Sequence, residues 1–152
     1  MDEFEDIDCR SSLFVGLTSE ALARHVASYT RTNATPRRVS TLLAEARRTF
    51  VGAAACYDNL ASSAFKSLQA AELALRELVG ATDSKLTLGA LLQQPTTRGA
   101  LTPDQFTWFQ EFALRFRNRL AHPDESIAFT PGMAEPFVRT AHETVAAMFP
   151  DA

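Results

Sequence analysis

The chain has 152 residues, of which 46% are hydrophobic, and its formal net charge is only −3. This length and apolar content suit one compact domain with a single sizeable core. So small a charge argues against a protein that holds nucleic acid through a broad basic surface. Because no run approaches the roughly 20 apolar residues that span a bilayer, and because the start is acidic rather than basic, we predict a cytoplasmic protein without a membrane partner.

Charge is distributed unevenly along the chain. Residues 1–10 contain five acidic residues and one arginine, a net of −4, so residues 11–152 sum to +1. We predict that residues 1–17 form an acidic, flexible N-terminus and that residues 18–152 form one helical domain. The alternative is that the acidic start mimics nucleic acid or binds a basic partner.

Cysteine and histidine spacing gives no indication of a metal centre. Cys9 and Cys56 lie far apart without a CxxC motif, and neither stands at metal-ligand spacing from His25, His122 or His142. The sequence therefore predicts no metal, no cofactor and no disulfide framework. His25 and His142 are interpreted as ordinary helix residues. The phosphate-loop, dinucleotide-binding, serine-hydrolase and zinc-protease motifs are also missing.

The fold class follows from the spacing of apolar residues, which recur every three or four positions over most of the chain, whereas the alternation typical of strands is almost absent. The prediction is an all-α protein. A first short helix is expected over 18–31, capped by Thr18 or Ser19. Two long helices should follow over 37–57 and 60–79, with Asn59 capping the second and Gly80 ending it.

The second half of the chain has the clearest helix start. After a short helix before Pro95 and a loop over 96–99, the run Thr102, Pro103, Asp104, Gln105 combines a hydroxyl cap, proline at the first helical position and a capping-box glutamine. We predict a helix over 103–121, which ends because Pro123 disfavours helical geometry at the preceding residue. A last helix is expected over 132–148.

The helix predicted over 103–121 divides into an aromatic and a polar face. At about 100° per residue, one broad face gathers residues expected in the core: Trp108, Phe109, Phe112, Phe116 and Leu120. The other side gathers Gln110, Glu111, Arg115, Asn118 and His122, with Arg117 at its margin. The polar groups are therefore expected to face solvent or a partner.

Arg117, Asn118 and His122 suit the cleavage of RNA by attack of its own 2′-hydroxyl. That reaction needs a base for the hydroxyl, a donor for the leaving oxygen and positive charge against the phosphorane. Histidine titrates near neutrality, and arginine offers a permanently charged fork matched to phosphate oxygens. Spacing alone is also compatible with a structural role, in which the helix dipole favours His122 at the helix end.

Arg117 and Asn118, followed by His122, resemble the signature of the HEPN superfamily: arginine, four to six residues, then histidine, with a polar residue after the arginine. The stretch 65–79, FKSLQAAELALRELV, is similar to the second helix of that family, and the break at Asp58 falls where its first hairpin would turn. The resemblance covers about 37–149. It implies an up-down bundle of four to five helices, here with an extra N-terminal helix, that pairs as a homodimer and joins two motifs in one cleft.

The resemblance also implies a function. Many HEPN proteins are metal-independent endoribonucleases of toxin–antitoxin, phage-defence or RNA-processing systems, and others are noncatalytic interaction modules. By this likeness Arg117 would bind the phosphate, His122 would act as base or acid, and Asn118 would position the site. The expected partners are substrate RNA, a second copy, and an antitoxin or defence complex. Some toxin members carry a modifiable tyrosine two residues after the histidine, but Asp124 stands there in this chain.

Three further residues are candidates around this motif. Glu72 would support the site by orienting Arg117, as an acidic residue of the family does, or would simply pair with Arg76 four residues later. Arg115 and Arg119 would follow the RNA backbone, or would be solvated edges of an amphipathic helix.

Overall fold

The computed structural model describes residues 10–11, 14, 17–120 and 129–152, and within them every regular element is helical. The predicted all-α class is confirmed for this part of the chain. None of the helices described there is long and apolar enough to cross a membrane. The elements are α1 (Ser19–Ala27), α2 (Arg37–Val51), the 3-10 turn η2 (Gly52–Ala54), α3 (Asn59–Val79), α4 (Leu88–Leu92), α5 (Pro95–Ala100), α6 (Pro103–Thr107), the π-helical segment η3 (Trp108–Ala113), α7 (Leu114–Leu120) and α8 (Pro131–Met148).

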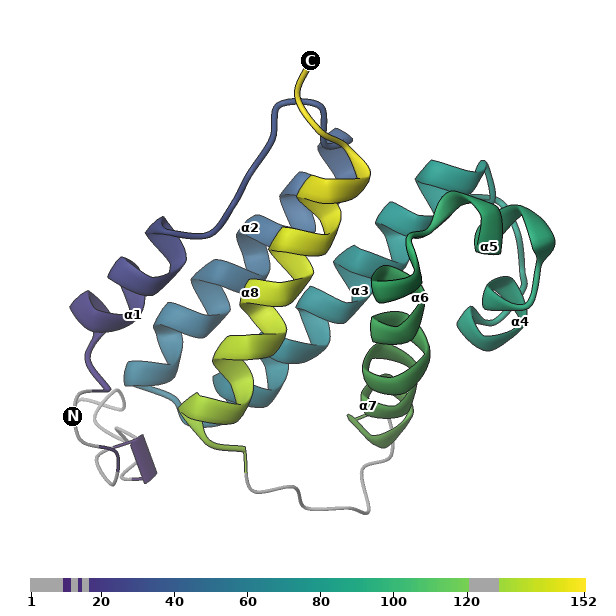
Figure 1. Cartoon of the computed structure of the whole chain (residues 1–152). Helices are drawn as coiled ribbons and strands as arrows, with labels where there is room; N and C mark the ends of the chain where they lie inside the picture. The colour runs from purple at the N-terminus through teal and green to yellow at the C-terminus, as the bar shows by residue number, and fades with distance from the viewer. Residues whose placement is uncertain (1–9, 12–13, 15–16, 121–128) are drawn as a thin grey trace.

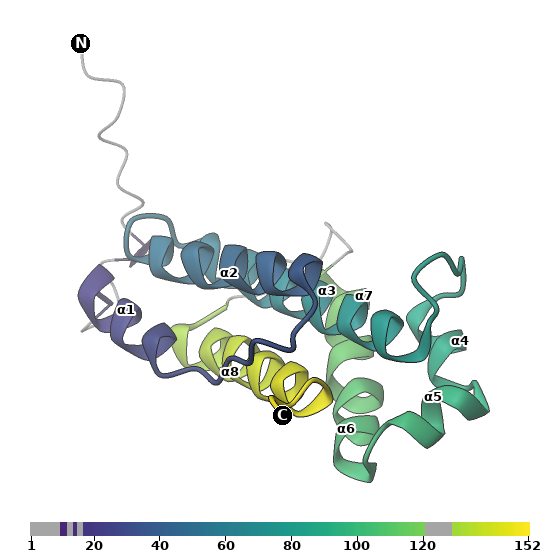
Figure 2. The same cartoon turned by 90° about the horizontal axis from the view of Figure 1, so that it is seen from above.

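Three long helices, α2, α3 and α8, form the body of the bundle. α3 packs along both α2 and α8, and α1 packs against α2 (Figure 1). Figure 2 shows α1 and α8 on one side of the layer formed by α2 and α3, while α6 and α7 flank the body at its other edge. α6, η3 and α7 follow one another without a break, so the helix predicted over 103–121 is present as 103–120.

Local signals placed several helix ends correctly. Thr18 caps α1 by accepting a hydrogen bond from the amide of Ala21, and Thr102 and Gln105 form the expected capping box. α3 ends at Gly80, whose φ of 69° is in the left-handed region that only glycine enters without strain. These three ends depend on residues within one helical turn, which is why the sequence predicts them.

Other predicted boundaries were wrong. Asn59 is the first residue of α3 rather than its cap, and no side-chain hydrogen bond is made at the cap position, Asp58. α1 ends at Ala27 and α2 at Val51, each earlier than predicted. Residues 96–99, predicted as a loop, are helical in α5, because Pro95 occupies a first-turn position where its missing N–H costs nothing.

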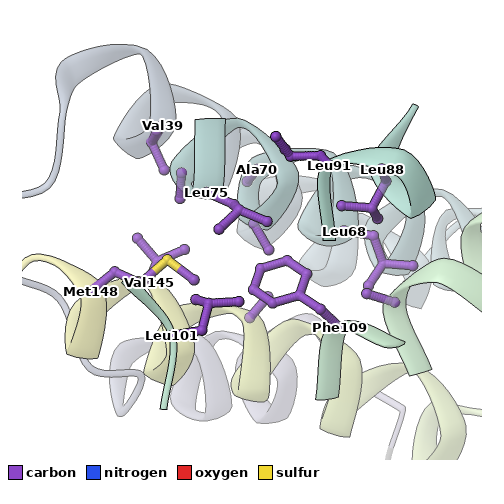
Figure 3. Packing of buried hydrophobic residues seen from close by; sticks show 14 of the residues in the cluster. Val39, Leu68, Ala70, Leu75, Leu88, Leu91, Leu101, Phe109, Val145 and Met148 are labelled. Carbon is purple, nitrogen blue, oxygen red and sulfur yellow. The ribbon is translucent and has the colours of Figure 1, made fainter. Parts of the chain in front are cut away.

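Two adjoining groups of buried side chains form the core. The larger joins α3, α8 and η3, and Figure 3 shows the ring of Phe109 pointing into its middle. The smaller lies toward α1 and includes Phe50, Leu60 and Phe129. Phe116 and Phe137 are partly buried against both groups, with ring centroids 4.2 Å apart. The helix of residues 103–120 is thereby fastened to α8 as well as to α3.

The predicted core face of the helix 103–120 was only partly right. Phe109 is fully buried, but Phe112 is 51% exposed, so the expectation that Phe112 lies in the core is wrong. The side of the helix that faces the core carries Phe109, Ala113 and Phe116, and Phe112 lies off this side. The π-helical turn widens the helix at this point, so regular α-helical spacing no longer fixes the face. The side chain of Leu120 lies outside the described residues.

Of the predicted N-terminal segment 1–17, the structure describes residues 10, 11, 14 and 17. Ser11 is buried and its hydroxyl donates to the carbonyl of Ala53, 2.9 Å away. The ring of Phe14 stacks on Tyr57 at 5.9 Å between centroids. Ser11 and Phe14 therefore contact the segment between α2 and α3.

Candidate functional site

Arg117 lies on α7 and reaches across to α3. Its Nε is 2.9 Å from Oε2 of Glu72, with 38% of the Arg117 side chain exposed against 12% for Glu72. The rotation of the helix toward α3, set by burial of Phe109 and Ala113, brings the two residues together. Arg117 is thus fixed at its inner end by a carboxylate and open to solvent at its outer end.

Glu72 joins two arginines. Its Oε1 accepts hydrogen bonds from Nη2 of Arg76 at 2.8 Å and from Nε of Arg76 at 3.3 Å, while Oε2 faces Arg117. Both interpretations offered from the sequence are therefore present, the pairing with Arg76 and the contact with Arg117. Arg76 also donates to the carbonyls of Ser84 and Leu86, which ties the segment after α3 to the same cluster. Four contacts restrict the rotamer of Arg76 and so hold the carboxylate of Glu72 in place.

The contact between Arg117 and Glu72 is an ion pair rather than a directed hydrogen bond. The buried Nε of Arg117 makes no hydrogen bond with any described residue, although Oε2 lies at ion-pair distance. Among the described residues, the Nη groups of Arg117 donate no hydrogen bond to a carboxylate. These groups form the edge of the guanidinium that binds two oxygens of a phosphate in bidentate fashion.

The other predicted site residues of this helix are exposed. Asn118 lies beside Arg117 at the surface, and Arg119 is exposed in the next position. Arg115 is exposed and pairs with Glu111 at 2.9 Å across one helical turn. His122 and Asp124 lie outside the described residues, so the structure brings Arg117 together with Glu72 but does not place the motif histidine.

Acidic, histidine and cysteine side chains are scattered over the described residues. In that part of the chain no three of them gather at a spacing that would hold a metal ion. Cys56 is exposed.

A second cluster was not anticipated from the sequence. His142 on α8 is fully buried, and its Nε2 lies 2.8 Å from Nη1 of Arg47 on α2. Because a guanidinium only donates, Nε2 accepts, and the proton is on Nδ1, which donates to the carbonyl of Val138 at 2.7 Å. Burial, offset in part by that hydrogen bond, lowers the pKa of His142 to about 4, with a further lowering from Arg47 and Arg31. The imidazole is therefore neutral near pH 7. The sequence could not predict this contact, because Arg47 and His142 lie on different helices and are far apart in the sequence.

No protein-family model, curated protein or solved structure matches this chain. Its function therefore has to be argued from the chemistry of these residues.

Proposed function

We propose that the chain is a metal-independent endoribonuclease of the HEPN type, acting in a toxin or phage-defence system. The observation that carries the proposal is the state of Arg117, whose Nε lies 2.9 Å from Glu72 while its side chain is 38% exposed and its Nη groups donate no hydrogen bond to a described carboxylate. A guanidinium that is held on one edge and open on the other is preorganised for an anion.

The reaction would proceed by attack of the RNA 2′-hydroxyl on the adjacent phosphorus, with departure of the 5′-oxygen and formation of a cyclic phosphate. Arg117 would stabilise the charge that grows on the non-bridging oxygens. His122, two residues beyond the end of α7, would take the proton from the hydroxyl or give one to the leaving oxygen. Asn118 would position the two groups, and Glu72 would hold Arg117.

Arg115 and Arg119 would contact the RNA backbone on either side of the scissile phosphate. Arg115 is exposed, and the ion pair that it forms with a described residue is with the exposed Glu111, a contact that a phosphate would replace at little cost. Such peripheral contacts should act mainly on RNA affinity, with a strong dependence on salt concentration.

One copy supplies one motif histidine, whereas the reaction uses both an acid and a base, so the proposed enzyme is a homodimer with a composite site. An apolar groove of about 240 Å³ supports pairing, because Trp108 and Phe112 line it from η3 and Phe137 lines it from α8. The residues Trp108 and Phe112 that line it lie on the same continuous helix as Arg117. A second copy covering this groove would bury Phe112, which is otherwise 51% exposed.

The alternative is a noncatalytic interaction module of similar fold. The ion pair of Arg117 with Glu72 favours it, because the same contact would serve to fasten α7 to α3. In the ribonuclease Arg117 would contribute to RNA cleavage, and in the interaction module it would only stabilise the fold. A cleavage assay distinguishes the two.

The deciding experiment measures cleavage of a single-stranded RNA in excess EDTA. Arg117→Ala and His122→Ala should each lower the rate roughly a hundredfold or more, as expected for a transition-state charge contact and a positioned acid or base. Arg117→Lys should remain strongly impaired, since it keeps the charge but loses the fork. Arg24→Ala, at an exposed position on α1, is the matched control and should leave the rate unchanged.

Three outcomes would contradict the proposal. The first is that folded Arg117→Ala and His122→Ala cut RNA at the wild-type rate, which would favour the interaction module. The second is activity that disappears with EDTA and returns with magnesium. The third is cleavage of DNA at a similar rate, since DNA lacks the 2′-hydroxyl.

A further inference from the structure

A second pocket lies away from α7, between the segment that links α1 to α2, the helix α2 and the helix α8. Its volume is about 300 Å³, within the lower range of small-ligand sites. Leu43, Val145 and Ala146 form its apolar part, and most of the remaining lining is polar. Figure 1 shows the C-terminal end of the chain beside this linking segment. No residue of α7 lines the pocket, so its role does not depend on the proposed ribonuclease site.

Arg47 enters this pocket with an uncompensated charge. Its partner is Nε2 of His142, a neutral acceptor, as the hydrogen bond from Nδ1 to Val138 requires. The side chain of Arg47 is partly buried, and a charge that is partly removed from water is usually balanced by a carboxylate, because desolvation is costly. Burial lowers the pKa of Arg47, and the nearby Arg31 and Arg48 lower it further. The neighbouring charges that shift Arg47 are thus positive, and no carboxylate among the described residues forms an ion pair with it.

Arg31 is the second cation of the pocket, and no carboxylate in the described part of the chain forms an ion pair with it. Asp151, the acidic residue in contact with the linking segment, accepts instead from the amide of Ala34 at 3.0 Å. Arg31 is close enough to lower the pKa of Arg47, and both line an open cavity. Their mutual repulsion is reduced only where an anion or bulk solvent screens it.

The walls of the pocket are held in position without a ligand. The hydroxyl of Thr32 donates a hydrogen bond to the carbonyl of Phe149 at 2.6 Å, which ties the linking segment to the end of α8. The same hydroxyl is hydrogen-bonded to that of Thr35 at 2.8 Å. Thr30 and Asn33 add polar groups to the lining, and the hydroxyl of Ser40 donates to the carbonyl of Arg37. A preformed site with this tethering loses little ordering entropy when it binds a small molecule.

We propose that this pocket binds a small phosphomonoester, such as a sugar phosphate, through Arg31 and Arg47. Two guanidinium groups match the two charges of a phosphomonoester, and a phosphodiester carries only one. The cavity leaves room beyond the phosphate for a polar group, which Thr30 and Asn33 would contact. His142 fixes the direction of Arg47 and does not itself carry charge toward the ligand.

The test is isothermal titration of the full chain with ribose 5-phosphate, with ribose as the uncharged control ligand. We expect binding of ribose 5-phosphate and none of ribose. Arg31→Gln should weaken binding about tenfold or more, the scale of one lost charge-assisted contact. Arg38→Gln removes the same charge from α2 outside this pocket and should change the affinity less than about twofold.

Arg47→Gln is expected to abolish binding, but it also removes the donor to His142 and so has its own effect on stability. Arg31→Gln avoids that difficulty, because Arg31 is exposed and forms no hydrogen bond or ion pair with another described residue. Absence of binding at millimolar ribose 5-phosphate would overturn the proposal, as would equal weakening by Arg31→Gln and Arg38→Gln. Loss of RNA affinity in Arg31→Gln without any sugar-phosphate binding would assign the pocket to nucleic acid instead. None of these readouts involves RNA cleavage, so the ribonuclease proposal is tested separately.

Discussion

Arg117 and Arg47 are held in opposite ways, and the difference suggests different ligands. Glu72, which also pairs with Arg76, offsets part of the charge of Arg117, so geometry should contribute a large share of the stabilisation of a phosphate bound there. His142 leaves the charge of Arg47 uncompensated, so an anion bound there would gain a full electrostatic attraction. Binding at Arg47 should therefore weaken more steeply with salt than catalysis at Arg117 does.

His142 makes the stability of the fold depend on pH. Its pKa is lowered from 6.5 to about 4 in the folded chain. Above pH 6.5 both the folded and the unfolded chain carry a neutral imidazole, and this residue has no effect on the pH dependence. Between about 6.5 and 4 only the unfolded chain takes up the proton, so the free energy of unfolding falls as the pH falls. The loss contributed by His142 should approach an upper value of roughly 3 kcal/mol.

The contribution is measured by comparing urea unfolding of the wild type and His142→Gln between pH 7 and pH 4. Carboxylates also titrate near the lower end, so the informative quantity is the difference between the two proteins. The variant should be less stable at pH 7, because Arg47 and Val138 lose their partner, and should lose less stability on acidification. Parallel curves would show that His142 is not protected from protonation by the fold.

At the scale of single elements, the sequence predicted what depends on neighbouring residues and missed what depends on the rest of the fold. The caps at Thr18 and Thr102 and the end at Gly80 involve hydrogen bonds or dihedral angles within one turn. The π-helical turn at Trp108–Ala113 has no signal in the local residue types, and the structure shows it where Phe109 and Ala113 enter the larger core group. α5 was missed because Pro95 was interpreted as a helix end when it is a helix start.

The rotated face of the helix 103–120 predicts contrasting effects of two neighbouring phenylalanines. Phe109 is fully buried at the centre of the core, so Phe109→Ala should lower the free energy of unfolding by about 3–5 kcal/mol. Phe112 is 51% exposed in the apolar groove, so Phe112→Ala should cost less than about 1 kcal/mol in a monomer. Urea unfolding at low protein concentration measures both. Equal losses would mean that the face predicted from regular helical spacing was correct after all.

At the scale of the whole molecule, the two candidate sites differ in how far they were predictable. Arg117, Asn118 and His122 lie within one short stretch, so a motif predicts them together, and the structure shows the contact with Glu72 that the sequence offered as one alternative. The pocket joins Arg31, Arg47 and His142 from three elements, and only packing brings them together. The spacing of these residues in the sequence does not predict that they lie together, so His142 was interpreted as an ordinary helix residue.

Dimerisation is the remaining expectation for the whole molecule, and the structure indicates where to test it. The polar side of the helix 103–121 was expected to face solvent or a partner, whereas the exposed apolar groove lies around Phe112. We expect Phe112→Glu to convert a dimer at micromolar concentration into a monomer, because burial of the new carboxylate against an apolar surface is costly. The fold should persist, since Phe112 is not part of the core.

Light scattering gives the mass of each variant, and the RNA assay gives its activity. Leu86→Glu is the matched control, because Leu86 is also an exposed apolar residue, 40% accessible, but lies outside the groove. If the active site is composite, Phe112→Glu should have the mass of a monomer and should not cleave RNA. Leu86→Glu should have the mass of a dimer and the wild-type rate of cleavage. Raising the concentration of Phe112→Glu should recover part of each, since association follows mass action. A monomeric Phe112→Glu that still cuts RNA at the wild-type rate would show that one copy of Arg117 and His122 suffices, and that the groove has a role other than pairing.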